Sequence, residues 1–125
     1  MTARPTIFLA EPDSALAESL RFTLELQGYA VFPVRTADLS DGCFDLAQPA
    51  CLILGERPRS TEMLDLAAEL QKKACPLPIV VLTTNPSRAT IMRAHSSGTL
   101  LIEKPLLGET LGEALGKLFH ACLAA

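Results

Sequence analysis

Several apolar runs of the chain are followed by short polar segments, at residues 11–13, 55–57, 83–85 and 103–105. These segments contain the carboxylates of Glu11 and Asp13, the hydroxyl of Thr83 and the ammonium group of Lys104. Carboxylate oxygens are preferred ligands of Mg²⁺, and a bound Mg²⁺ neutralises the charge of a phosphoryl group. If the fold brings the four segments together, two carboxylates, a hydroxyl and an ammonium group would share one pocket.

Short apolar runs alternate with longer amphipathic segments along the whole chain. The pattern predicts a first strand that begins at Thr6, and further strands at 29–34, 51–54, 79–82 and 100–102. It predicts helices at 14–27, 36–47, 61–73 and 85–96, and a fifth whose buried stripe is Leu111, Leu115, Leu118 and Cys122. Such alternation is typical of a parallel sheet covered on both faces. We therefore expect one domain over residues 1–125, a flavodoxin-like (βα)5 fold with strand order 2-1-3-4-5.

Local signals place the helix ends. Asp13 is expected to cap the first helix, and Gly28 to end it in a left-handed conformation. Asn85 is expected to be the N-cap of the fourth helix, with Pro86 as its first residue. In this fold, the carboxyl ends of the strands carry the functional loops, which would bring the four polar groups together.

The segments 6–13, 52–55, 78–83 and 101–105 resemble the first, third, fourth and fifth strands of response-regulator receiver domains, the CheY-like family. The resemblance spans the chain and implies the roles of its pocket residues. It implies that position 55 is the phosphate acceptor, that Thr83 is the hydroxyl switch residue and that Lys104, before Pro105, is the family's lysine. A working receiver also holds Mg²⁺ with two acids after the first strand and with the acceptor.

Several positions depart from this pattern. The acceptor position is Gly55, the second acidic position is Pro12, and Leu101 replaces the aromatic residue that usually moves with the switch. Pro58 follows Gly55 by three residues rather than the usual four. We therefore expect a vestigial phosphorylation pocket of Glu11, Asp13, Gly55, Thr83 and Lys104, with no Mg²⁺ and no catalytic residue.

Two glutamates, Glu11 and Glu56, remain in the predicted pocket region. Glu56 is a less favoured alternative acceptor, because a step of one residue along a strand turns the side chain to the opposite face. Without an acyl phosphate to neutralise, Lys104 is free to pair with Glu11, and this pairing is a hypothesis of the sequence analysis.

A receiver that lacks its acceptor still has its docking surface on helices one, four and five. The resemblance thus implies a non-enzymatic protein of bacterial two-component signalling that binds a histidine kinase or a response regulator, most simply to inhibit it. Segments 19–22, 28–31 and 102–105 are similar to the receiver of FixJ, and a FixT-type antikinase is one form of this function. A homodimer contact through the apolar C-terminal residues is a further alternative.

Four cysteines, Cys43, Cys51, Cys75 and Cys122, form no CxxC pair. The predicted fold places them near the amino ends of the strands, opposite the pocket. Buried cysteines often act as small apolar residues, which is the first interpretation. The alternatives are a ligand set for an iron–sulfur cluster, which the resemblance to FixT-type antikinases favours, a zinc site, or a redox disulfide.

Composition narrows the functional classes further. The formal net charge is −3, with no basic stripe, which argues against nucleic-acid binding. The apolar runs are too short to span a bilayer, so membrane insertion is not expected. No signal-peptide pattern appears at the N-terminus, and we expect a cytoplasmic location.

Overall fold

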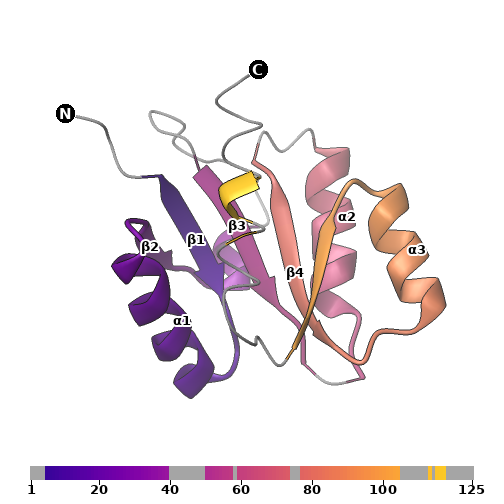
Figure 1. Cartoon of the computed structure of the whole chain (residues 1–125). Coiled ribbons are helices and arrows are strands. Elements are labelled where there is room, and N and C mark those ends of the chain that lie inside the picture. The colour runs from indigo at the N-terminus through magenta and orange to yellow at the C-terminus, as the bar shows by residue number, and fades with distance from the viewer. Residues whose placement is uncertain are drawn as a thin grey trace.

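A computed structural model describes residues 5–39, 50–57, 59–73, 77–104, 113 and 115–117. The described residues contain one parallel sheet with strand order β2-β1-β3-β4-β5 (Figure 1). Its strands are β1 (Thr6–Ala10), β2 (Ala30–Pro33), β3 (Ala50–Gly55), β4 (Ile79–Thr84) and β5 (Leu100–Lys104). The helices are α1 (Ser14–Leu26), α2 (Glu62–Lys72) and α3 (Arg88–Ser96). The expected flavodoxin-like order is confirmed.

Side chains of the central strands alternate between two cores, one on each face of the sheet. On one face, here called the α1 face, strand residues pack with Leu20 and Leu24 of α1 and with Leu115. On the other, the α2 face, the intervening strand residues pack with Ala67 and Leu70 of α2. Fully burying one such leucine contributes about 1.5–3 kcal/mol. The sheet is therefore covered on both sides, as its continuous apolar runs predict.

The start and the end of α1 follow the sequence signals. Asp13 Oδ1 accepts hydrogen bonds from the backbone N–H groups of Ala15 and Leu16, at 3.0 and 3.2 Å. The chain leaves the helix through Gly28, whose φ of +99° lies in the left-handed region. Both predictions for this helix are confirmed.

The prediction for the start of α3 is wrong. Asn85 has a left-handed φ of +47°, and the N-cap is Ser87, whose Oγ accepts a hydrogen bond from Thr90 N at 3.1 Å. An N-cap residue has an extended backbone, which Ser87 has and Asn85 lacks. The helix therefore begins at Arg88, and Pro86 lies in the loop before it.

Two predicted helices are described only in part. The segment 36–47 begins with one 3₁₀ turn, η1 (Thr36–Leu39), and residues 40–49 lie outside the described residues. In the fifth helical segment, residues 113 and 115–117 are helical and Leu115 is fully buried, as predicted. The rest of its predicted stripe, Leu111, Leu118 and Cys122, lies outside. None of the helices in the described residues has the length and apolar character of a membrane span.

Candidate functional site

The alternation of the strands decides which polar side chains meet beyond their carboxyl ends. Counting in steps of two from the buried residues places Glu11, Gly55, Thr84 and Lys104 on the α1 face. Three of these side chains, those of Glu11, Thr84 and Lys104, line one cavity of about 370 Å³. Asp13 lines it as well, from the start of α1. This cavity is where the sequence analysis places the vestigial pocket.

Glu11 and Lys104 form the ion pair that the sequence analysis expected. Lys104 Nζ donates a hydrogen bond to Glu11 Oε1 at 3.2 Å and lies 3.2 Å from Oε2. The Glu11 side chain is fully buried, and the Lys104 side chain is 15% exposed. Glu11 Oε1 also accepts a hydrogen bond from Asp13 N, whereas Oε2, buried beside Nζ, has no well-aligned hydrogen bond. Two charges removed from water thus depend on each other.

The carboxylate of Glu11 lies over Gly55. A Cβ atom added to Gly55 would overlap with Oε2 and Cδ of Glu11. Any side chain at position 55 would therefore have to displace the buried ion pair. The resemblance implied that position 55 carries the acceptor carboxylate, and in this structure the carboxylate of Glu11 takes the corresponding space.

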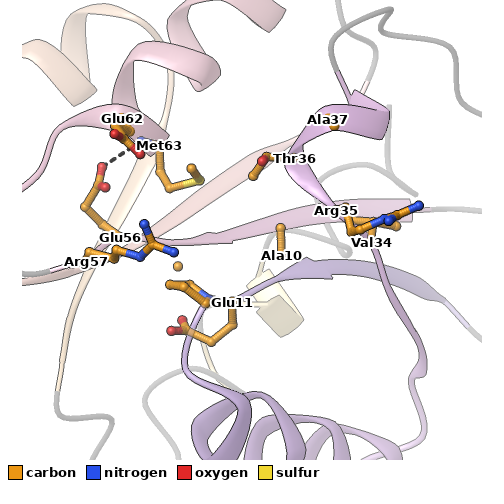
Figure 2. Close-up of a pocket in the computed structure, with 12 residues that line it drawn as sticks. Ala10, Glu11, Val34, Arg35, Thr36, Ala37, Glu56, Arg57, Glu62 and Met63 are labelled. Carbon is orange, nitrogen blue, oxygen red and sulfur yellow. Dashed lines mark hydrogen bonds between the residues drawn. The ribbon is translucent and has the colours of Figure 1, made fainter.

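The side chain of Glu56 binds the amino end of helix α2. Its side chain turns away from Glu11 toward the start of that helix, as Figure 2 shows, and only 3% of the residue is exposed. Glu56 Oε2 accepts hydrogen bonds from Met63 N at 2.8 Å and Leu64 N at 3.2 Å. The helix's own N-cap residue, Thr61, makes no side-chain capping bond. Glu56 therefore supplies the cap, and its negative charge suits the positive end of the helix.

Arg57 occupies the space between these acids. Figure 2 shows its side chain directed into a second, adjoining cavity of about 430 Å³, which Glu11, Glu56 and Met63 also line. Arg57 is exposed and forms no ion pair with the other described residues. Its positive charge is the group of this cavity that remains available to an anion or an acidic partner.

The residues do not fit a magnesium site. Of the three positions that would supply carboxylates, Pro12 and Gly55 have none, and the carboxylate of Glu11 is held by Lys104. Among the described residues, no group of three or more potential ligands is close enough together to hold a metal ion. The residue at the acceptor position is Gly55, and the neighbouring acid, Glu56, caps α2. The arrangement therefore supports an ion-paired, structural pocket rather than phosphoryl transfer.

Thr83 lies apart from the other predicted pocket residues. Its neighbour Thr84 lines the cavity with Glu11 and Lys104, while Thr83 follows Ile79 and Val81 onto the α2 face. There it lines a third cavity together with Arg59 and Asn85. The structure thus brings together Glu11, Asp13, Gly55 and Lys104, and separates Thr83 from them.

One of the four cysteines lies in the described residues. Cys51 is fully buried on the α1 face, among Ile7, Ile53 and other apolar side chains. Burial raises the pKa of the neighbouring Tyr29 hydroxyl above its usual value, and the charge of an ionised Cys51 adds to the effect. Cys43, Cys75 and Cys122 lie outside the described residues. The iron–sulfur hypothesis stays a prediction, to be tested by the iron content and visible spectrum of protein purified without oxygen.

The capping role of Glu56 was not predicted from the sequence. The signal was available, because Glu56 is two residues beyond Leu54 in a strand whose even-numbered residues face α2. The same alternation along β4 places Thr83 on the α2 face and Thr84 on the α1 face. Alternation beyond the last buried residue therefore carries information that a match to a motif does not.

Solved structures of known proteins share this architecture, although no protein-family model and no curated protein matches the chain. A CheY-like response regulator receiver domain protein from Methanospirillum hungatei JF-1 is 18% identical, with a TM-score of 0.78 over 95% of this chain and 96% of that one. FixJ-N is 18% identical, with a TM-score of 0.74 over 96% of each chain. The response regulator StyR is 26% identical, with a TM-score of 0.75 over 92% of this chain and 59% of StyR. By its strand order and these likenesses, the chain has the fold of the response-regulator receiver domains.

Proposed function

We propose that the protein is a receiver-like signalling protein that works without phosphorylation. It binds a histidine kinase or a response regulator of a two-component system and inhibits it. The observation that carries the proposal is the buried pair of Glu11 and Lys104, whose carboxylate overlaps with the space for a side chain at Gly55. A domain with the receiver fold and no free acceptor in its pocket acts through the surfaces it presents.

The pair also fixes the state of the pocket. In a receiver, the resemblance implies that the lysine contacts the acceptor and its phosphoryl group, so the contact changes with phosphorylation. Here Lys104 is held by Glu11 and by the backbone oxygen of Glu56, to which its Nζ donates at 3.2 Å. These contacts belong to the unmodified chain. The binding surface is therefore present constitutively.

Helix α1 offers an apolar surface for such a partner. Phe22 and Leu26, one helical turn apart, are 67% and 74% exposed. Two large apolar side chains exposed side by side offer the centre of a protein–protein contact. Helix one is among the surfaces through which receivers meet their partners, so the position of the two side chains supports docking on a kinase or a regulator. The proposal places this interaction in the cytoplasm.

The test uses purified histidine kinases from the same cell. Autophosphorylation of each kinase is followed with labelled ATP in the presence and absence of the protein, and binding is measured by calorimetry. We expect one kinase to be bound and its autophosphorylation rate to fall. If no kinase binds, the cognate response regulators are tested in the same way for binding and for phosphoryl acceptance. Failure to bind or inhibit any member of either class contradicts the proposal.

A further inference from the structure

The cavity lined by Thr83 is chemically distinct from the two near Glu11. It has a volume of about 400 Å³ and lies between the loop that precedes α2 and the loop from β4 to α3. Its lining contains one arginine, one asparagine and six residues with hydroxyl groups, and no carboxylate. The two cavities near Glu11 each contain several carboxylates. The Thr83 cavity is therefore the one whose own charge favours an anion.

Thr83 is the most buried of the residues that line this cavity. The residue is 6% exposed, and its side chain makes no hydrogen bond within the described part of the chain. Thr83 Oγ1 is not among the fully buried atoms without a partner, so its oxygen is open to the cavity. A ligand oxygen in the cavity would supply the missing partner.

Other hydroxyl groups of the lining have hydrogens left to donate. Ser60 Oγ accepts a hydrogen bond from Glu62 N at 3.2 Å, and Thr90 Oγ1 accepts one from Ser87 Oγ at 3.0 Å. A hydroxyl that accepts one bond can still donate its own hydrogen. Both hydroxyls can therefore still donate a hydrogen bond to a ligand in the cavity.

Positive charge comes from two directions. Arg59 is exposed, lines the cavity and forms no ion pair with another described residue. Helix α3, with nine residues, begins at the same cavity, since its N-cap Ser87 is part of the lining. The amino end of a helix carries partial positive charge and binds anions. A guanidinium group and a row of hydroxyl and amide donors match the oxygens of a phosphate group.

We infer that this cavity binds the phosphate group of a small phosphate monoester. Arg59 pairs with the phosphate oxygens, Asn85 and the hydroxyls of Ser60 and Thr90 donate to them, and Thr83 gains the partner it lacks. The volume exceeds that of the phosphate group alone and leaves room for a small organic part. The site does not depend on the kinase-binding proposal, because its ligand is recognised without α1.

The first experiment is a titration of ¹⁵N-labelled protein with ribose 5-phosphate, followed by NMR at constant ionic strength. Inorganic phosphate and ribose are titrated separately. We expect saturable shifts at the amides of Ser60, Thr83 and Asn85 with ribose 5-phosphate, equal or weaker binding of inorganic phosphate, and none of ribose. The absence of saturable shifts, or shifts centred on Arg57 and Lys104, would overturn the inference. So would binding of ribose alone.

Two arginine variants separate a specific site from general attraction to positive charge. Arg59→Gln keeps a long polar side chain, and Arg57→Gln removes the same charge from the neighbouring cavity. The loss of a charge-assisted hydrogen bond predicts roughly tenfold or more weaker binding for Arg59→Gln and unchanged binding for Arg57→Gln. Equal effects of the two changes would contradict the assignment.

A third variant tests the buried hydroxyl. Thr83→Val has nearly the same shape and removes the hydroxyl alone, so we expect roughly fivefold weaker binding of ribose 5-phosphate with the amide shifts at Ser60 retained. Undiminished binding to Thr83→Val would show that the hydroxyl does not face the ligand.

Discussion

The carboxylate of Glu11 lies where the side chain of residue 55 would begin, so Glu11 and Gly55 depend on each other. Glycine at position 55 leaves the space, and Glu11 fills it with a carboxylate that reaches Lys104. A negative charge thus lies beside the lysine, in the space where the family resemblance implies the acceptor carboxylate. The glycine at position 55 and the glutamate at position 11 form one structural arrangement.

This overlap predicts that Gly55→Ala destabilises the protein. Glycine to alanine at an unstrained position usually stabilises by about 0.4–1 kcal/mol, but a methyl group here must displace a buried, paired carboxylate. Overpacking of this kind costs about 1–3 kcal/mol, so we expect a lower free energy of unfolding in urea. In a Glu11→Ala background, the same change should be neutral or stabilising.

Gly116→Ala is the matched control, because an added Cβ at that helical position contacts nothing within 4 Å. It should leave the stability unchanged or raise it. If Gly55→Ala behaves like Gly116→Ala, the carboxylate of Glu11 does not occupy the space over Gly55.

Lys104→Met tests the buried pair. The change leaves the fully buried carboxylate of Glu11 without its counter-charge, and breaking a buried pair on one side costs about 3–5 kcal/mol. We expect a loss near the lower end, measured by urea unfolding, because Lys104 retains some exposure. The double variant Glu11→Met with Lys104→Met should recover most of the stability, since it removes both charges. Lys72→Met, at an exposed lysine of α2, is the control and should have little effect.

Glu56→Ala should loosen the start of α2. It removes the acceptor for the N–H groups of Met63 and Leu64, and the loss of a helix cap costs about 0.5–2 kcal/mol. Hydrogen exchange should become faster at these two amides, with little change in α1. Glu62→Ala, at an exposed residue in the first turn of the same helix, is the control. Unchanged exchange at Met63 and Leu64 would refute the capping role.

The interaction face can be located by charge substitution. Phe22→Glu and Leu26→Glu place acids on the exposed side of α1, while Ile91→Glu and Met92→Glu do so on α3, whose apolar side chains are 50% and 62% exposed. If the partner docks on α1, the first pair should weaken its binding at least tenfold and the second pair should not. The binding constant with the purified partner is the measurement, and the opposite ranking would move the interface to α3.

The sequence predicted the sheet because its strands are short, apolar and buried on both sides, a pattern that few folds require. It also predicted the ends of α1, since an aspartate before a helix and a glycine after it act locally. The prediction at Asn85 failed because an asparagine is equally suited to a left-handed turn, which it adopts here. A local signal with two structural uses cannot decide between them.

The site was less predictable than the fold. The pair of Glu11 and Lys104 joins residues 93 positions apart and was inferred from the strand ends that carry them. The Glu11 carboxylate occupies the space over Gly55 because of the direction of its side chain. The spacing of residues in the sequence does not predict that direction. Thr83 was grouped with Lys104 by resemblance, whereas the alternation of β4 directs it to the other face of the sheet.

On the proposed function, the pocket around Glu11 and Lys104 accepts no phosphoryl group. The most direct test is the intact mass of the protein after incubation with acetyl phosphate and Mg²⁺, beside a working receiver treated in the same way. We expect the working receiver to gain the mass of one phosphoryl group and this protein to gain none. An acid-labile phosphoryl group on this protein, mapped to Glu11 or Glu56, would contradict this expectation.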